Sequence, residues 1–386
     1  MRFILGILVI TLISCGTKKQ QQEQQFLKDI SINQIDGNVE ALLEDTLINS
    51  LSIGIYYNGK EITKHYGELD KGQKNQPTNK TIYEIASVTK TFVGTIIAQA
   101  EIEGKLSIED DIRKYIGKQY KNLEFETNPI RIKHLLTHTS ELPRFLPENI
   151  NDLFTNMDDE LPFKLAEIEK AYSKSKFLKD LENVSITAAP GTRFAYSNAD
   201  TELAAYILEQ IYNKSFDELL IETICKKANM PNTRIRLNRK QKENLANGYF
   251  GGSGRIAPHM STSLWGASGA GKSTIVDLLN YIKLQLDKQN KPVQKTHQTL
   301  YDKEIIFGDP DNKIGYFWII NKDEDFGKFL SHHGGANGTQ NWLVIYPEIG
   351  LGISIISNQG HFQTGGKLWN IIEVITNEIR KNHSKD

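Results

Sequence analysis

Strand patterns near both ends of the chain, with helical patterns between them, constrain the fold most strongly. Near the start, residues 51–57 and 61–66 are rich in β-branched and aromatic residues and flank Asn58-Gly59, a dipeptide typical of a tight hairpin turn. Three more strand patterns follow late in the chain, at residues 315–320, 342–346 and 351–356. Strands so far apart in sequence predict an antiparallel sheet that distant segments complete, with a helical subdomain inserted between them.

Helical periodicity fills the stretch between the strands. A helix is predicted from residue 87 to about 103 and a closing helix from about 367 to 381. The apolar residues also recur at helical spacing in five other segments: 111–115, 131–137, 161–181, 200–212 and 216–228. The expected fold class is therefore α/β (α+β), with helices flanking the sheet. We expect residues 31–80 and 265–386 to form the α/β part and residues 81–264 a mainly helical part.

A serine and a lysine three residues apart open the first long helix. Positions i and i+3 face the same way on a helix, so the Lys90 ammonium can reach the Ser87 hydroxyl. A serine hydroxyl is a weak nucleophile that needs a neighbouring base or cation, and the helix N-terminus adds partial positive charge. The chain holds a second Ser-x-x-Lys, from Ser173 to Lys176, in a polar stretch that a solvated helix face explains.

Two later segments carry groups suited to the same chemistry. Tyr196 and Asn198 stand two residues apart after a Pro-Gly turn signal, so an extended loop would point both side chains to one side. His332-His333-Gly334-Gly335 comes just before two strong strand patterns. Attack on an acyl carbonyl needs a nucleophile, a proton donor for the leaving group and preorganised N–H donors. Together, Ser87, Lys90, Tyr196 and the glycine-flanked strand supply one of each. Tyr196 can act as a base because a nearby lysine ammonium favours the phenolate form of tyrosine.

With these segments in this order, the chain resembles the serine β-lactamase and penicillin-binding-protein superfamily. The likeness is to the class C-like branch, which includes esterases, D-aminopeptidases and D-Ala-D-Ala carboxypeptidases, and it runs from about Leu51 to the C-terminus. The connecting phrases at residues 105–111, 132–140 and 190–194 also match. The resemblance implies a β-lactamase/transpeptidase-like fold and a serine hydrolase that acts on a small-molecule or peptide substrate without metal or cofactor.

The resemblance also implies a role for each matching residue. Ser87 would form the acyl-enzyme, with Lys90 and Tyr196 as proton-transfer partners. Four further residues would bind the substrate, with the amides of Ser87 and Gly335 forming the oxyanion hole: Asn198, His332, Gly334 and Gly335. His333-Gly334-Gly335 offers a second register of His-x-Gly, but the spacing to Gly338 favours His332.

Three residues depart from the family pattern. Glu141 stands where glycine is usual, and Asp200 stands where a small residue is common, so either is expected to alter the rim of the cleft. His332 replaces the lysine of Lys-Thr-Gly, which removes a permanent cation that would pair with a β-lactam carboxylate. Efficient β-lactamase activity is therefore not expected.

The N-terminus predicts export and lipid anchoring. Residues 1–14 have a basic start and an apolar run too short to span a bilayer, as a signal peptide does. Leu-Ile-Ser-Cys resembles the bacterial lipobox, which implies cleavage before Cys15 and lipid on its sulfur; the alternative is a plain signal peptide with an incidental cysteine. Residues 15–30 read as a flexible tether. A lipid-anchored protein of the bacterial cell envelope, facing the periplasm or exterior and without an intrachain disulfide for Cys225, is expected.

Other function classes fit the sequence less well. The formal net charge of −1 and the lack of a basic block argue against nucleic-acid binding. Residues 266–273 match the P-loop pattern, but no buried strand precedes them, so nucleotide binding remains a minor alternative. His134 and His138 lie one helical turn apart, where packing explains them better than zinc. A non-catalytic binding or sensor module with the same fold remains an alternative function. For residues 143–183 two interpretations remain, a plain helical cover over the core and a lid that controls substrate access.

Overall fold

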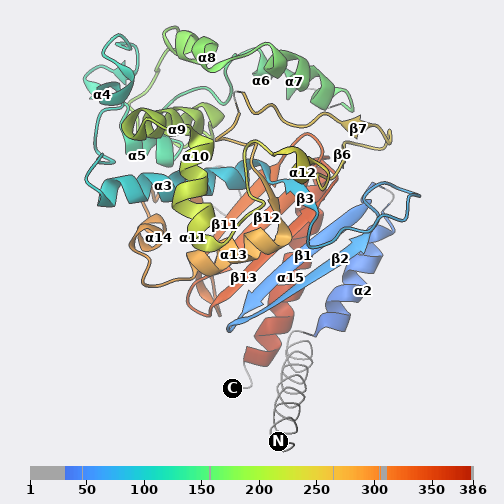
Figure 1. Cartoon of the computed structure of the whole chain (residues 1–386). Helices are drawn as coiled ribbons and strands as arrows, with labels where there is room; N and C mark the ends of the chain where they lie inside the picture. The colour runs from blue at the N-terminus through green and yellow to red at the C-terminus, as the bar shows by residue number, and fades with distance from the viewer. Residues whose placement is uncertain are drawn as a thin grey trace, which may run out of the picture.

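The computed structural model describes residues 31–383 except 46, 156–157, 264, 304 and 306–310. The predicted signal peptide, Cys15 and tether lie outside the described residues. The main element is a seven-stranded antiparallel sheet of order β2-β1-β13-β12-β11-β10-β9 (Figure 1). Its strands are β1 (Ser50–Tyr57), β2 (Lys60–Gly67), β9 (Lys313–Gly315), β10 (Trp318–Asp323), β11 (Gly327–Gly335), β12 (Gln340–Tyr346) and β13 (Leu351–Ser357).

The predicted completion of the sheet by distant strands is confirmed. β1 pairs with β13 along its length, with Leu51 opposite Ser357 and Tyr57 opposite Leu351. The hairpin between β1 and β2 turns at Asn58 and Gly59, both of which have positive φ, as a two-residue turn of this kind requires. The N-terminal hairpin therefore joins the C-terminal strands in a single sheet.

Helices cover both faces of this sheet. α2 (Ile32–Leu43) and α15 (Gln363–His383) pack on one face, while α3 (Thr89–Ile102) and α13 (Ile275–Gln285) lie on the other (Figure 1). Every residue of β13 is buried, because Ile353 and Ile355 face the first layer and Ile356 faces the second. A strand covered on both faces shows no alternation of apolar and polar residues.

Of the other helices, α4 to α9 lie above α3 at the top of Figure 1, and α14 lies below it. The predicted helix at 161–181 is two helices, because Ser173 caps a new one by accepting a hydrogen bond from the Lys176 N–H. No helix among the described residues is both long and apolar enough to cross a membrane. The bounds are α4 (Arg113–Ile116), α5 (Ile132–Leu136), α6 (Ile150–Leu153), α7 (Leu161–Lys170), α8 (Lys174–Leu181), α9 (Asn198–Tyr212), α10 (Phe216–Leu220), a π-helical turn Ile221–Cys225, α11 (Lys226–Ala228), α12 (Arg239–Lys242) and α14 (Lys291–Thr296).

Short strand pairs connect the two parts, and one predicted strand is broken. β3 (Ile82–Glu84) pairs with β8 (Lys272–Thr274), and two further pairs are β4 (Glu124–Phe125) with β5 (Asn128–Pro129) and β6 (Gly248–Tyr249) with β7 (Ile256–Ala257). The continuous strand predicted at 315–320 is wrong: Tyr316 and Phe317 both have positive φ and separate β9 from β10. The Phe317 N–H instead donates to the Leu136 carbonyl. The division of the chain at residues 81 and 264 stays a prediction.

Candidate active site

Ser87 lies in a single 3-10 turn, Ala86–Val88, between β3 and α3. Ala86 holds a φ of 45°, a left-handed conformation that non-glycine residues seldom adopt, directly before the serine. Two side chains of the sheet hold the preceding backbone: Thr339 donates to the Glu84 carbonyl and Asn341 to the Ile85 carbonyl. The sheet thereby fixes the position of the serine.

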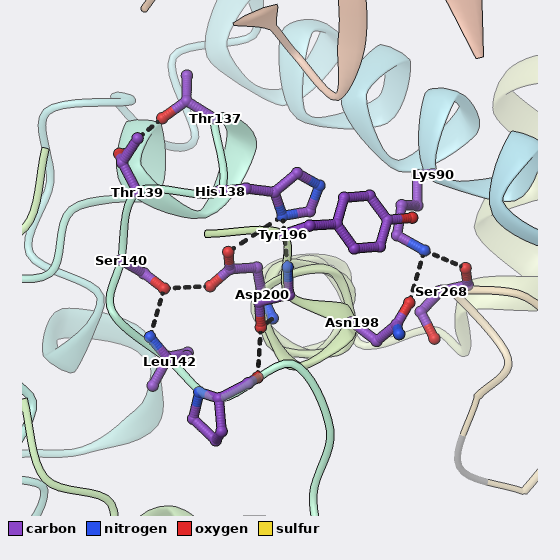
Figure 2. A network of polar contacts seen from close by, with 12 residues as sticks. Lys90, Thr137, His138, Thr139, Ser140, Leu142, Tyr196, Asn198, Asp200 and Ser268 are labelled. Atoms are coloured by element: carbon purple, nitrogen blue, oxygen red, sulfur yellow. Dashed lines mark hydrogen bonds and ion pairs between the residues drawn. The ribbon is translucent and has the colours of Figure 1, made fainter. Parts of the chain in front are cut away.

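Lys90 lies one turn after Ser87, on the first turn of α3, and its side chain is fully buried. The Lys90 ammonium lies 3.0 Å from the Ser87 hydroxyl and 2.8 Å from Oδ1 of Asn198, and it also donates to the Ser268 carbonyl. Figure 2 shows these last two contacts at the end of the lysine side chain. All three donor positions of the ammonium are thus used, which compensates for its burial.

Tyr196 completes the group. Its hydroxyl lies 2.9 Å from Ser87 Oγ, and the Lys90 ammonium lies 5.1 Å from the centre of its ring. Tyr196 precedes α9, and Asn198 is the first residue of that helix. The structure therefore brings together four residues that the sequence singled out from two separate motifs: Ser87 and Lys90, and Tyr196 and Asn198.

The His-x-Gly segment forms the end of β11, beside Ser87. The His333 ring contacts Trp342, which contacts Trp369 of α15, so His333 faces the α15 layer. Since side chains alternate along a strand, His332 faces the opposite layer, which contains Lys90. Burial, together with the nearby Lys90 cation, lowers the pKa of His332 to about 3, so the imidazole is neutral.

Glycine at position 334 lets β11 approach the serine turn. A Cβ atom at Gly334 would lie 2.4 Å from the Ile85 carbonyl oxygen, so only glycine fits there. The Ala336 N–H donates to the Thr339 carbonyl. Because hydrogen-bonded and non-hydrogen-bonded pairs alternate along an antiparallel ladder, the N–H of the preceding residue, Gly335, points away from β12. Gly335 borders the cavity in front of Ser87, whereas His332 and Gly334 are not among the residues that line it.

A buried pair that sequence reasoning did not assign to the site lies behind Tyr196. The His138 ring is 4.5 Å from the Tyr196 ring, and its Nδ1 is 3.2 Å from the Asp200 carboxyl group (Figure 2). Ser140 also donates to Asp200. Burial raises the pKa of Asp200 well above its usual range and lowers that of His138 well below, so the pair has no net charge.

Two of the three departures from the family pattern, Asp200 and Glu141, now have a structural account. Asp200 is fully buried behind Tyr196, so the expectation that it alters the cleft rim is wrong. Glu141 adopts a φ of 70°, the conformation that favours glycine, and its carboxylate accepts two hydrogen bonds from Arg193. This bidentate pair offsets part of the strain.

Ser268 is a further contact that sequence reasoning missed. Its carbonyl accepts from Lys90, and its N–H donates to Glu202 of α9 at 2.7 Å. Backbone groups carry no side-chain signature, so only the Gly/Ala-rich composition around Ser268 could have drawn attention to the loop. Burial raises the pKa of Glu202 to about 7.

Glu202→Gln is expected to make the protein more stable at pH 8. The folded pKa of Glu202 lies above the ordinary value of 4.5, so the folded state binds more protons between these values. The stabilisation from this group is thus complete below about pH 4.5 and is lost as the pH rises through 7. Glutamine keeps an acceptor for the Ser268 N–H without a charge. Thermal unfolding of both proteins at pH 4.5 and pH 8 measures the effect.

The control for this prediction is Glu209→Gln on the same helix. Glu209 forms an ion pair with Lys174, so its neutralisation is expected not to raise the melting temperature at pH 8. Equal melting temperatures of wild type and Glu202→Gln at pH 8 would contradict the raised pKa.

A cavity of about 410 Å³ opens in front of Ser87. Tyr196, Asn198, Ser268 and Gly335 border it. The rest of the wall comes from these residues: Arg144, Phe145, Phe154, Leu161, Pro162, Leu165, Glu169, Phe250, Met260, Trp265, Gly269, Ala336, Asn337, Gln340, Gly360 and Phe362. The four-residue group thus faces a space large enough for a small molecule or part of a peptide.

The P-loop match at residues 266–273 does not form a phosphate cradle. Lys272 lies in β8, where its buried ammonium donates to the Ala270 carbonyl at 2.8 Å and lies 3.6 Å from Glu84. A Cβ atom at Gly271 would lie 2.3 Å from Thr89, so this backbone is packed against α3. The lysine is therefore occupied by the protein itself.

The family model described as Beta-lactamase matches residues 35–375. The chain therefore belongs to the beta-lactamase family, and the resemblance inferred from its motifs is confirmed. Its antiparallel sheet, flanked by helices, is the fold of that family's serine hydrolases.

Among particular proteins, the chain is 29% identical over 341 residues to Protein flp of Staphylococcus aureus (strain MRSA252). That match covers 86% of this chain and 64% of the relative, so the chain spans less than two thirds of the staphylococcal protein. It is 24% identical to a beta-lactamase of Providencia stuartii, over 92% of this chain and 91% of the relative.

Solved structures show the same fold. A beta-lactamase/D-alanine carboxypeptidase from Yersinia pestis superposes with a TM-score of 0.74 at 21% identity, covering 90% of this chain and 97% of the other. A class C beta-lactamase superposes with a TM-score of 0.74 at 19% identity, covering 89% and 95%. The fold predicted from the sequence is confirmed.

Proposed function

We propose that the protein is a serine hydrolase that acts through an acyl-Ser87 intermediate on an ester, amide or D-amino-acid peptide. The observation that carries this proposal is the position of Ser87 Oγ, within 3.0 Å of the Lys90 ammonium and 2.9 Å of the Tyr196 hydroxyl. This group faces a cavity, and a nucleophile with two proton-transfer partners is the arrangement that covalent acyl transfer needs.

In the acylation step, Tyr196 as phenolate takes the Ser87 proton, with the Lys90 ammonium stabilising the negative charge. The Oγ–carbon bond forms, and the carbonyl oxygen becomes an oxyanion. The N–H groups of Ser87 and Gly335 would hold that oxyanion, since the first N–H groups of a helical turn have no partner within it. The bond from carbon to the leaving group then breaks, and Tyr196 returns the proton to the leaving alcohol or amine.

In the deacylation step, water loses a proton to Tyr196 and adds to the acyl carbon. The Oγ–carbon bond breaks, Ser87 recovers a proton, and the carboxylic acid leaves. Asn198, held by Lys90, would position the acyl group through its carboxamide. His332, neutral beside Lys90, and Gly334 would shape the floor of the site, and a neutral imidazole offers no cation to a β-lactam carboxylate. Efficient β-lactamase activity is therefore not part of the proposal.

The proposal includes the location of the protein in the bacterial cell envelope. The signal-peptide pattern of residues 1–14 and the lipobox-like Cys15 support a membrane anchor through lipid on that cysteine. The catalytic part would then face the periplasm or exterior, tethered by residues 15–30.

The test is the intact mass of the whole chain after exposure to a fluorophosphonate, which phosphonylates activated serines. One adduct per chain, mapped to Ser87 by peptide sequencing, is the expected result. Folded protein without an adduct would contradict the proposal and favour a non-catalytic binding module with the same fold.

A further inference from the structure

We infer that the enzyme selects apolar acyl groups, because the cavity in front of Ser87 has a wall of aromatic and aliphatic side chains. The inference rests on the proposed function and names the substrate class of the same site. The wall is formed by Phe145, Phe154, Leu161, Leu165, Met260 and Trp265.

The aromatic part of the wall is an ordered group. The rings of Phe145 and Phe154 stack at 4.9 Å, and the Trp265 ring meets Phe145 edge-on at 5.7 Å. Leu161 and Leu165, one turn apart on α7, are buried and extend this wall. A preformed apolar wall releases its water when an apolar group enters, and such a group gains dispersion contacts there.

The mouth of the cavity is also apolar. Phe362 borders the cavity, and 49% of its surface is exposed to solvent. Phe250 lines the same region and is buried. An apolar substrate group at the mouth would remove the Phe362 ring from water.

Charged groups in the wall are few and already in contact with protein. Among the described lining residues, Arg144 is the cation, and its guanidinium lies over the rings of Phe145 and Phe154 at 5.4 and 5.2 Å. Glu169 is the carboxyl group, and it is buried and accepts from the Ser261 N–H. Arg144 is exposed and Glu169 is buried, so the charged groups of the lining leave its aromatic and aliphatic wall apolar.

The acyl half of the substrate, rather than the leaving group, fits this space. After acylation the acyl group stays bonded to Ser87 while the leaving group must reach solvent. Asn198 and Gly335, which we assign to the acyl carbonyl, border the same cavity as the apolar wall. Thus Phe145, Phe154, Leu161 and Leu165, within the segment that the sequence left open as cover or lid, supply part of the acyl-binding wall.

The experiment compares p-nitrophenyl hexanoate with p-nitrophenyl acetate as substrates of the full chain in phospholipid nanodiscs. We expect kcat/KM for hexanoate to exceed that for acetate about tenfold or more, because added methylenes gain binding in an apolar pocket. We also expect Phe154→Ala to lower this ratio about tenfold by removing one stacked ring. Phe362→Ala, at an exposed position where folding is not at stake, is expected to lower it about threefold.

The matched control is Phe163→Ala. Phe163 lies on α7, in the same segment, but it stacks on Arg255 at 3.8 Å and does not line the cavity. The Phe163→Ala substitution is expected to leave the hexanoate-to-acetate ratio of kcat/KM unchanged. Because this variant is measured in the same nanodiscs, it also controls for partition of the esters into lipid. Equal kcat/KM for both esters, or an equal fall in all three variants, with normal fluorophosphonate labelling of Ser87, would overturn the inference and leave the proposed function standing. Absence of any adduct on Ser87 would overturn both.

Discussion

Ser87→Ala is expected to abolish hydrolysis and fluorophosphonate labelling, with kcat/KM falling about 10⁴-fold or more. The substitution removes the atom that forms the covalent bond, the hydroxyl that lies between Lys90 and Tyr196. The fold is expected to survive, because the hydroxyl that alanine lacks bonds to these two side chains at the border of the cavity. Ester hydrolysis and intact mass, with circular dichroism of the same sample, measure the outcome.

Ser173→Ala is the control, because Ser173 opens the other Ser-x-x-Lys. Its hydroxyl caps α8 by accepting from the Lys176 N–H, at an exposed site far along the sequence from Ser87. Loss of this cap is expected to cost about 1 kcal/mol of stability and no activity. Turnover that persists in Ser87→Ala at the wild-type rate would show that another residue is the nucleophile.

The sequence predicted the sheet and the four central site residues because their signals are local. The Asn58-Gly59 turn and the apolar strands fix which segments are strands, and the short spacings of Ser87 with Lys90 and of Tyr196 with Asn198 fix which side chains share a direction. Their convergence from distant segments was inferred from resemblance, since spacing within a motif contains no information on the distance between motifs.

The features that the sequence did not predict depend on tertiary contacts. The break between β9 and β10 arises where the Tyr316 carbonyl packs against Gly94 of α3, where a Cβ atom would lie 2.1 Å away. The third acceptor for Lys90 is a backbone carbonyl, which any residue offers. The burial of Asp200 beside His138 also depends on a helix and a loop that are 62 residues apart in sequence. No pattern of adjacent residues encodes these contacts.

The segment 143–183 shows how one stripe of apolar residues can serve two roles. Sequence periodicity predicted an apolar face, but a face against the core and a face against a cavity have the same composition. In the structure Leu161 and Leu165 are buried in the core and also border the cavity, whereas Phe163 on the same helix does neither. Only the tertiary packing around α7 separates these positions.

Tyr196→Phe is expected to lower kcat about 10²- to 10⁴-fold, the usual contribution of a positioned proton-transfer group, with little change in stability. Phenylalanine keeps the ring contact with His138 and the position of the ring beside the Lys90 ammonium, so only the hydroxyl at 2.9 Å from Ser87 is lost. Steady-state and single-turnover hydrolysis of p-nitrophenyl hexanoate separate the effect on acylation from that on deacylation.

Tyr212→Phe is the matched control for the loss of a phenolic hydroxyl beside a lysine. Lys105 lies 4.0 Å from the centre of the Tyr212 ring, and the hydroxyl donates to Glu103 at 2.8 Å, but Tyr212 does not line the cavity. Its activity is expected to match wild type. If Tyr196→Phe also turned over at the wild-type rate, proton transfer would have to pass through Lys90 alone. Because Lys90 already donates to Asn198 and Ser268, the ammonium would then need to lose one of three hydrogen bonds during turnover, whereas the phenol can transfer a proton without moving.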